Sequence, residues 1–237
     1  MRDIYTFFTR LRQEQLMLSE PKVLKLDCCL SLFLYFSAQC YRRSRVRMKR
    51  LTLADILVTV LISFIFGIIY KMVGLTVAAL KPLGLHLDQI AYGLWFIAAI
   101  VAFLIIRKPG VAILAELAAG AGETILSGEL NMSIIMHSLA QGLACELIFL
   151  IFKYKSTKAS VAMLAGATAG IFTVPVDWFF NYLGNMPWWN VILLYVIRIL
   201  SGTILSGLFG YYIVLSLEKT GVTRLYQSST KKDIDSL

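Results

Sequence analysis

The stretch that decides the fold is LADILVTVLISFIFGIIYKMVGLTVAAL, residues 53–80, in which Asp55 and Lys71 are the only charged side chains. A bilayer core about 30 Å thick needs about 20 apolar residues per helical crossing, because each residue rises about 1.5 Å along the helix axis. A helix also bonds its backbone polar groups within the segment, which a lipid environment requires. Residues 53–80 are therefore predicted to cross a membrane as one helix.

Five further stretches meet or approach that length, and they span residues 86–106, 111–128, 131–152, 158–183 and 188–215. The chain of 237 residues is 58% hydrophobic and 16% charged, and its mean hydropathy is +0.74, far from the balance of a soluble domain. The 111–128 stretch is short and holds two glutamates, so we expect it to pack inside the bundle. We predict an all-α membrane protein, a bundle of six transmembrane helices.

The basic residues are unevenly placed along the chain. Lys and Arg number 23 against 14 Asp and Glu, but their distribution does not indicate a nucleic-acid-binding face. They gather before residue 53, at 107–108, at 153–158 and after residue 215. Lys81 is the only basic residue in the loops near 81–87, 128–131 and 184–188. This positive-inside pattern predicts that both termini and the 107 and 155 loops are cytoplasmic, and that the other three loops lie outside.

Three regions differ in composition: a basic N-terminal extension at 1–50, the transmembrane domain at 51–217 and a cytoplasmic tail at 218–237. The apolar run at 28–38 is too short to span a membrane. Met48 and two basic residues directly precede the first helix, so we hypothesise that translation begins at Met48 and that the preceding stretch is not native. The alternative is a cytoplasmic arm that its arginines hold to anionic lipid.

The sequence lacks the GxxxxGK[ST], HExxH and GxSxG motifs. It therefore offers no support for ATP hydrolysis or for the familiar zinc and serine hydrolytic chemistries. The four cysteines show no metal-ligand spacing with histidine, and we expect no disulfide, no metal site and no cofactor. A binding component that depends on other proteins for energy fits these features.

Polar and aromatic side chains gather toward the outer ends of the predicted helices, where each one is a functional candidate because its burial in a membrane is costly. A flat organic cation can stack on Trp and Tyr rings while a carboxylate neutralises it and an amide reads its polar edge. A thiazolium or an aminopyrimidine would suit such a site. The candidate substrate-binding residues are Tyr92, Trp95, Glu116, Glu123, Gln141, Glu146, Asp177 and Tyr195.

Structural interpretations compete with the functional one. Glu116 and Arg198 are both expected to be buried and could form an ion pair with each other. His137 is expected to hydrogen-bond between packed helices, and Trp188 and Trp189 to anchor the chain at the membrane interface. The functional interpretation is preferred for Glu123, Tyr92, Trp95 and Gln141.

Small residues at Ser63, Gly67, Gly74 and Ala78 are spaced so that they share one face of the 53–80 helix. Such a face lets another helix approach closely. That second helix could belong to the same chain or to a partner protein, and the sequence leaves both uses open.

Five groups of residues, taken in their order along 51–225, are informative as a set. They are Tyr92-Gly93-Leu94-Trp95-Phe96-Ile97, Arg107-Lys108-Pro109-Gly110, Glu116 with Glu123, Gln141-Gly142 with Glu146, and Val196-Ile197-Arg198 with Ser201-Gly202. Together they resemble the YkoE-type membrane proteins, which are substrate-binding S components of energy-coupling factor (ECF) transporters associated with thiamine or its hydroxymethylpyrimidine precursor. The ordered set carries the resemblance, and no single motif does.

The resemblance implies an S-component bundle with an outward-facing pocket in a bacterial plasma membrane. It also implies that the helices at 53–80, 86–106 and 111–128 dock, through small residues, on an ECF transmembrane coupling subunit that two cytoplasmic ATPases drive. The face at Ser63, Gly67, Gly74 and Ala78 would be that docking surface, and the loop near 81–86 a gate.

We therefore expect a transporter subunit, not an enzyme, that captures thiamine or hydroxymethylpyrimidine outside the cell. An S component for a different vitamin stays open. A membrane enzyme that uses Glu116, Glu123, His137 and Glu146 on a lipid substrate would place these groups toward the cytoplasmic leaflet or a lateral opening. A purely structural subunit would pair its polar groups internally and leave no cavity.

Overall fold

The computed structural model describes residues 51–83, 88–129, 131–184 and 186–221. The predicted N-terminal extension, with its hypothesised start at Met48, lies outside these residues. So do half of the predicted gate, residues 84–86, and most of the C-terminal tail.

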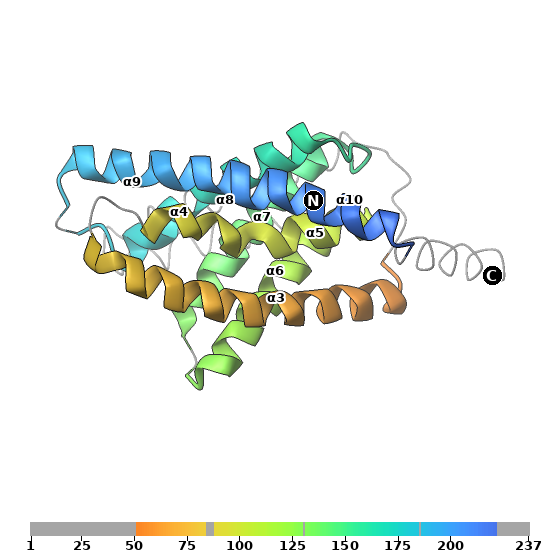
Figure 1. Cartoon of the computed structure of the whole chain (residues 1–237), viewed down its shortest axis with the longest axis horizontal. Coiled ribbons are helices and arrows are strands. Elements are labelled where there is room, and N and C mark those ends of the chain that lie inside the picture. Colours follow the sequence, from red (N-terminus) through yellow and green to blue (C-terminus); the bar gives the residue numbers. More distant parts are fainter. Residues whose placement is uncertain (1–50, 84–87, 130, 185, 222–237) are drawn as a thin grey trace, which may run out of the picture. The chain divides into compact units, whose positions relative to one another are not determined.

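Within the described residues the chain is helical, with short turns between the helices (Figure 1). The elements are α3 (Leu53–Leu80), η1 (Lys81–Leu83), α4 (Asp88–Tyr92), η2 (Gly93–Phe96), α5 (Ile97–Ile106), α6 (Val111–Ser127), α7 (Met132–Ile151), α8 (Ala159–Phe179), α9 (Trp188–Ser201), η3 (Gly202–Leu208) and α10 (Phe209–Lys219). The elements α4, η2 and α5 form one continuous segment, and α9, η3 and α10 form another. With α3, α6, α7 and α8 these make six helical segments, as the hydrophobic pattern predicts.

Five of the six segments are long and apolar enough to cross a membrane. The exception is α6, which has 17 residues. It packs against both α3 and α7, and in Figure 1 it crosses behind α3 at a steep angle. Its glutamates and most of its small residues are buried, so this short helix lies within the bundle.

Glycine makes the crossing of α3 and α6 possible. A Cβ placed on Gly67 would lie 2.9 Å from the carbonyl oxygen of Ala119, so a larger residue would force the two backbones apart. Ser63 on α3 is also buried, whereas Gly74 is half-buried and Ala78 is exposed. Two of the four residues predicted to dock a partner thus lie within this chain's own packing.

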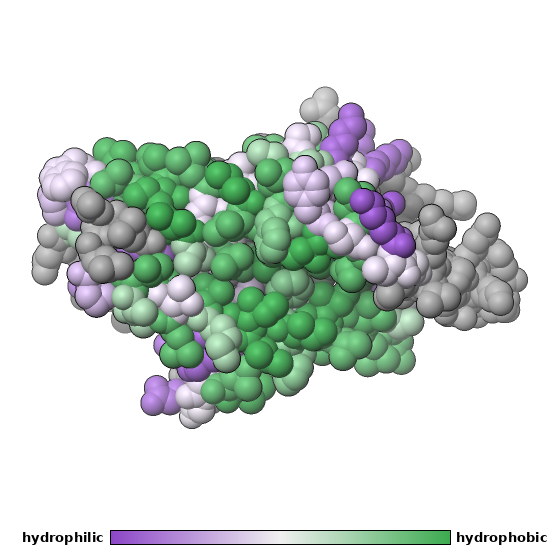
Figure 2. Space-filling view, viewed as in Figure 1, coloured by the Kyte–Doolittle hydropathy of each residue, from purple (hydrophilic) through white to green (hydrophobic). Residues whose placement is uncertain are grey.

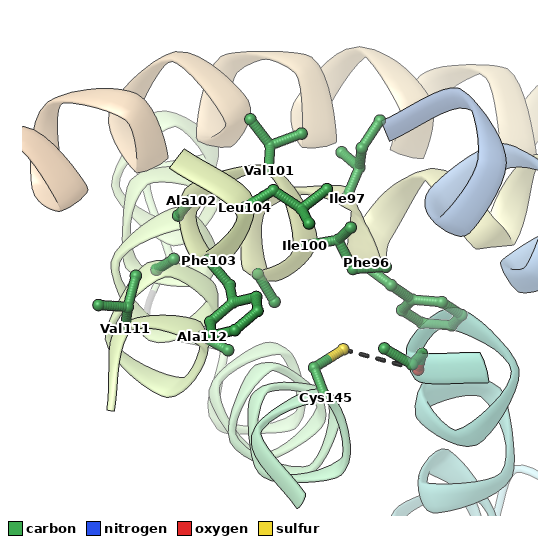
Figure 3. Close-up of a cluster of buried hydrophobic side chains, with 14 of the residues drawn as sticks. Phe96, Ile97, Ile100, Val101, Ala102, Phe103, Leu104, Val111, Ala112 and Cys145 are labelled. Atoms are coloured by element: carbon green, nitrogen blue, oxygen red, sulfur yellow. Dashed lines mark hydrogen bonds between the residues drawn. The ribbon is translucent and has the colours of Figure 1, made fainter. Parts of the chain in front are cut away.

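The core of the bundle surrounds α5, every residue of which is buried. Figure 3 shows its side chains gathered with Val111 and Ala112 of α6 and with Cys145 of α7. Phe103 stacks on Phe149 of α7, with ring centroids 3.6 Å apart. The outside is apolar as well: α3 exposes large hydrophobic side chains along most of its length, and green surface covers the middle of the molecule in Figure 2. An apolar exterior is what a lipid-embedded bundle requires.

The α5–α6 turn marks one end of the bundle, which we call the basic end because its turns carry the residues 107–108 and 153–158. Lys108 forms a buried ion pair with Asp55 at the start of α3. Glu146 of α7 accepts hydrogen bonds from the backbone N–H groups of Gly110 (2.6 Å) and Ala112 (3.1 Å), and so caps the start of α6.

Candidate functional site

A cavity of about 500 Å³ opens at the end of the bundle opposite to the basic end. All six helical segments contribute to its lining, together with η1 and the turn that follows α8. The lining residues are Val77, Lys81, Asp88, Gln89, Tyr92, Trp95, Glu123, Ser133, Ile134, His137, Ser138, Gln141, Asp177, Tyr182, Leu183, Met186, Leu194 and Arg198. The volume lies within the usual range for small-molecule sites, about 300–1,000 Å³.

Aromatic rings from the α4–η2 junction form one wall of the cavity. The rings of Tyr92 and Trp95 meet edge to face, with centroids 5.0 Å apart. Their common direction follows from the 3₁₀ geometry of η2, because side chains three residues apart eclipse one another in a 3₁₀ helix. The indole Nε1–H of Trp95 donates to Glu123 Oε1 of α6 at 3.3 Å. A carboxyl group and two ring faces therefore adjoin one side of the cavity.

Arg198 of α9 connects two other segments at the cavity, α8 and α4. Its guanidinium forms an ion pair with Asp177 of α8 and donates to Thr173 Oγ1 (2.7 Å) and to Gln89 Oε1 (2.9 Å). The same group lies over the ring of Tyr92, 3.8 Å from the centroid. The expected ion pair between Arg198 and Glu116 is wrong, because Asp177 neutralises the arginine.

Asp177 has further partners besides Arg198. Its Oδ2 accepts a hydrogen bond from the Tyr195 hydroxyl at 2.7 Å, and its Oδ1 lies 2.9 Å from His137 Nε2. His137 Nδ1 lies 2.8 Å from the carbonyl oxygen of Ser133, one turn earlier on α7. His137 thus bonds between helices, as expected, and also lines the cavity.

The carboxyl groups of the cavity differ in how fully they are paired. Asp177 is bonded to Arg198, His137 and Tyr195, and Asp88 accepts from the Gln89 amide at 2.5 Å. Glu123 accepts from a neutral indole, and within the described part of the chain no ion pair includes it. Glu123 and Asp88 are therefore the lining carboxyl groups outside these ion pairs, and Glu123 is the one that bonds a ring of the aromatic wall.

Five of the eight predicted substrate-binding residues line the cavity: Tyr92, Trp95, Glu123, Gln141 and Asp177. Three do not. Glu116 is fully buried and bonds Tyr70 and the backbone of Ala99, Glu146 caps α6 at the basic end, and Tyr195 contacts Asp177 from behind the lining.

Sequence reasoning did not single out several lining residues, among them Asp88 and Gln89. Both stand at the start of an otherwise apolar segment, and a polar pair there is a signal that could have been used. Arg198 was recognised as buried, but its place in the cavity depends on the packing of α8 against α9.

Comparisons with known proteins agree on the type of protein. Residues 54–172 match a family model described as the permease component of an ABC-type cobalt transport system. The putative HMP/thiamine permease protein YkoE of Bacillus subtilis (strain 168) is 33% identical over 179 residues, which are 74% of this chain and 88% of that protein. The crystal structure of an S-component of ECF transporter superposes with a TM-score of 0.69 and 31% identity, covering 79% of this chain and 97% of that one.

These relatives are transporter components and not enzymes, and the cavity removes the alternative of a structural subunit without a binding site. The chain belongs to the YkoE-type family of S components of ECF transporters.

Proposed function

We propose that this S component binds thiamine or its hydroxymethylpyrimidine precursor in the cavity. The observation that carries the proposal is the carboxyl group of Glu123 beside the rings of Trp95 and Tyr92. Ring faces attract and stack a flat cation, and a carboxyl group that no other cation occupies neutralises its charge. Gln141 and Asp177 supply further polar atoms to the lining of the cavity.

The lining favours an organic ring over the cobalt ion of the matching family description. Cobalt requires several nitrogen, oxygen or sulfur ligands that converge on one point. The cavity instead offers aromatic walls and carboxyl groups on different segments, and no metal-binding group of three His, Cys, Asp or Glu residues occurs in the described ranges.

The cavity is proposed to open to the outside of the cell. It lies at the end of the bundle where α3 ends and where α7 and α9 begin, and the basic residues are concentrated at the other end. The positive-inside rule makes the basic end cytoplasmic. An importer of a scarce vitamin would bind its substrate from this outer side of a bacterial plasma membrane.

Transport is proposed to depend on an ECF coupling subunit and two cytoplasmic ATPases, since the sequence contains no ATP-binding motif of its own. Because Ser63 and Gly67 pack within the chain, the docking surface would be the exposed apolar side of α3 together with Ala78. Cross-linking from cysteines placed at Leu57, Leu61 and Ala78 to a co-expressed coupling subunit would test this surface.

Binding is tested by titrating purified protein with thiamine, hydroxymethylpyrimidine, riboflavin or Co²⁺ while tryptophan fluorescence is recorded. Saturable quenching by one of the first two compounds at submicromolar concentration is expected. Quenching by riboflavin or Co²⁺ alone would replace the assigned substrate. Absence of any quenching by thiamine and hydroxymethylpyrimidine would refute the proposal.

Glu123→Gln separates the two candidate substrates. If the carboxyl group meets the thiazolium, the variant weakens thiamine binding by about 30-fold or more and changes hydroxymethylpyrimidine binding little, because only thiamine carries the permanent charge. If it meets the aminopyrimidine, both compounds lose affinity together. An unchanged affinity for both would remove Glu123 from the site. Glu146→Gln, at the basic end, is the matched control and should bind both normally.

A further inference from the structure

The segment that supplies the aromatic wall is interrupted within the membrane. Between α4 and α5 the chain turns through the 3₁₀ element η2, so the first N–H groups of α5 have no acceptor within their own helix. In a lipid-embedded core each such unbonded group costs several kcal/mol. The N–H of Ile97 donates to the carbonyl oxygen of Leu94 in η2, whereas those of Ala98 and Ala99 take partners from other helices.

Two side chains from other helices accept these N–H groups. The backbone N–H of Ala98 donates to the Tyr70 hydroxyl of α3 at 3.0 Å, and that of Ala99 donates to Glu116 Oε2 of α6 at 3.1 Å. The Tyr70 hydroxyl in turn donates to Glu116 Oε1 at 2.9 Å. All four residues are essentially inaccessible to solvent. Tyr70 and Glu116 thus form a long-range cap on the N-terminus of α5.

The other side of the interruption is held by α9. The backbone N–H of Gly93 donates to Ser201 Oγ at 2.9 Å, and the Ser201 hydroxyl donates to the carbonyl oxygen of Ile90. A Cβ on Gly93 would collide with the backbone of Ser201. The turn through η2 is therefore fixed from two directions.

The segment between these contacts is the one that faces the cavity. Asp88, Gln89, Tyr92 and Trp95 all belong to residues 88–96, and all line it. The cap lies directly after this stretch, and neither Tyr70 nor Glu116 lines the cavity. A change in the cap would therefore act on a ligand indirectly, by moving the aromatic wall that adjoins the cap.

We infer that Tyr70 and Glu116 are positioning residues, which set the orientation of Tyr92 and Trp95 toward the cavity by capping the interrupted helix. The effect on ligand affinity rests on the proposed function, but the effect on the rings does not. Glu146 provides the comparison, because its carboxyl group caps α6 in the same manner at the basic end.

The test uses a background in which Trp95 is the single tryptophan, made by Trp178→Phe, Trp188→Phe and Trp189→Phe. These three side chains are more than half exposed and do not line the cavity. Tyr70→Phe removes only the hydroxyl and keeps the ring volume. Glu116→Ala removes both acceptors, and Glu116→Gln retains one oxygen for Ala99. Glu146→Ala and Glu146→Gln are the matched controls.

Trp95 emission without ligand is the first measurement. We expect a shift of the emission maximum and increased acrylamide quenching in Tyr70→Phe and Glu116→Ala, a smaller change in Glu116→Gln, and no change in either Glu146 variant. Thiamine titration is the second measurement, with about tenfold weaker binding expected in the first two variants, near the effect of one lost hydrogen bond.

The inference is overturned if Tyr70→Phe leaves the emission and quenching of Trp95 unchanged, or if Glu146→Ala changes them equally. The second result would mean that the signal reports general destabilisation. A shift of Trp95 emission in a protein whose parent binds neither thiamine nor hydroxymethylpyrimidine supports the positioning role and refutes the proposed substrates. The two claims therefore fail separately.

Discussion

The two ends of the bundle both bury acidic side chains, but they use them differently. At the basic end Asp55 is paired with Lys108, and Glu146 is bonded to two backbone N–H groups. At the cavity end Asp177 is paired with Arg198, while Glu123 is bonded to an indole beside open space. Acidic side chains thus hold helices together at the basic end, and at the other end they line the cavity.

This difference has a physical reason. A buried carboxyl group without partners is costly in a membrane. A carboxyl group with a structural role is therefore expected to be ion-paired or hydrogen-bonded within the same chain. An acid left facing a cavity is stabilised by water or by a ligand. Breaking an ion pair should therefore lower stability at either end, but it should lower ligand affinity only at the cavity end.

The largest effect is expected for Arg198→Met. The variant leaves Asp177 buried without its cation, which costs about 3–5 kcal/mol of stability, and it removes the group that lies over the Tyr92 ring. Both the apparent Tm in detergent and the affinity for thiamine should fall. Retention of wild-type affinity in the folded fraction would show that the arginine does not shape the cavity.

Lys108→Met breaks the ion pair at the basic end and should also lower the apparent Tm, by a comparable or slightly smaller amount, because Asp55 keeps its bonds to Thr52. Ligand affinity of the folded protein should stay unchanged, since neither residue lines the cavity. Loss of binding without loss of stability would contradict the division between the two ends.

The sequence predicts the six helical segments closely, because length and hydrophobicity are local properties. The 53–80 helix is reproduced as predicted, and 111–128 ends one residue earlier. The interruption at η2 and the π-helical turn η3 were not predicted. Both occur in continuous apolar stretches. Ser201 bonds η2, and Tyr70 and Glu116 cap the start of α5 that follows it. These partners come from other helices, which no local pattern reveals.

The site is predictable to a similar extent. Depth along each helix followed from the topology, and it brought Glu123, Tyr92, Trp95 and Gln141 to the cavity end. The sequence does not show, for every segment, toward which neighbouring helix a side chain points. Glu116 precedes Glu123 by two turns on the same helix, yet it reaches α5 instead of the cavity, because Tyr70 and the freed N–H groups lie there.

A smaller effect is expected for Gly67→Ala, paired with Gly74→Ala. The added methyl group at Gly67 meets backbone atoms of α6 at 2.9–3.3 Å, whereas at Gly74 the nearest atoms lie at 3.7–3.8 Å. Overpacking of one methyl group should cost about 1–2 kcal/mol at Gly67 and nothing measurable at Gly74. Equal changes in the apparent Tm would mean that the α3–α6 crossing is looser than the glycine contacts indicate.

The smallest effect is expected for Trp189→Phe. Its side chain is 67% exposed and does not line the cavity, so thiamine affinity should change by no more than about twofold, as for other exposed positions. Trp95→Phe removes the indole N–H that bonds Glu123 and should weaken binding clearly more. Because both substitutions replace one tryptophan by the same residue, the difference between them isolates the wall of the cavity from the apolar exterior. A larger loss in Trp189→Phe than in Trp95→Phe would move the binding site from the interior of the bundle to its outer rim.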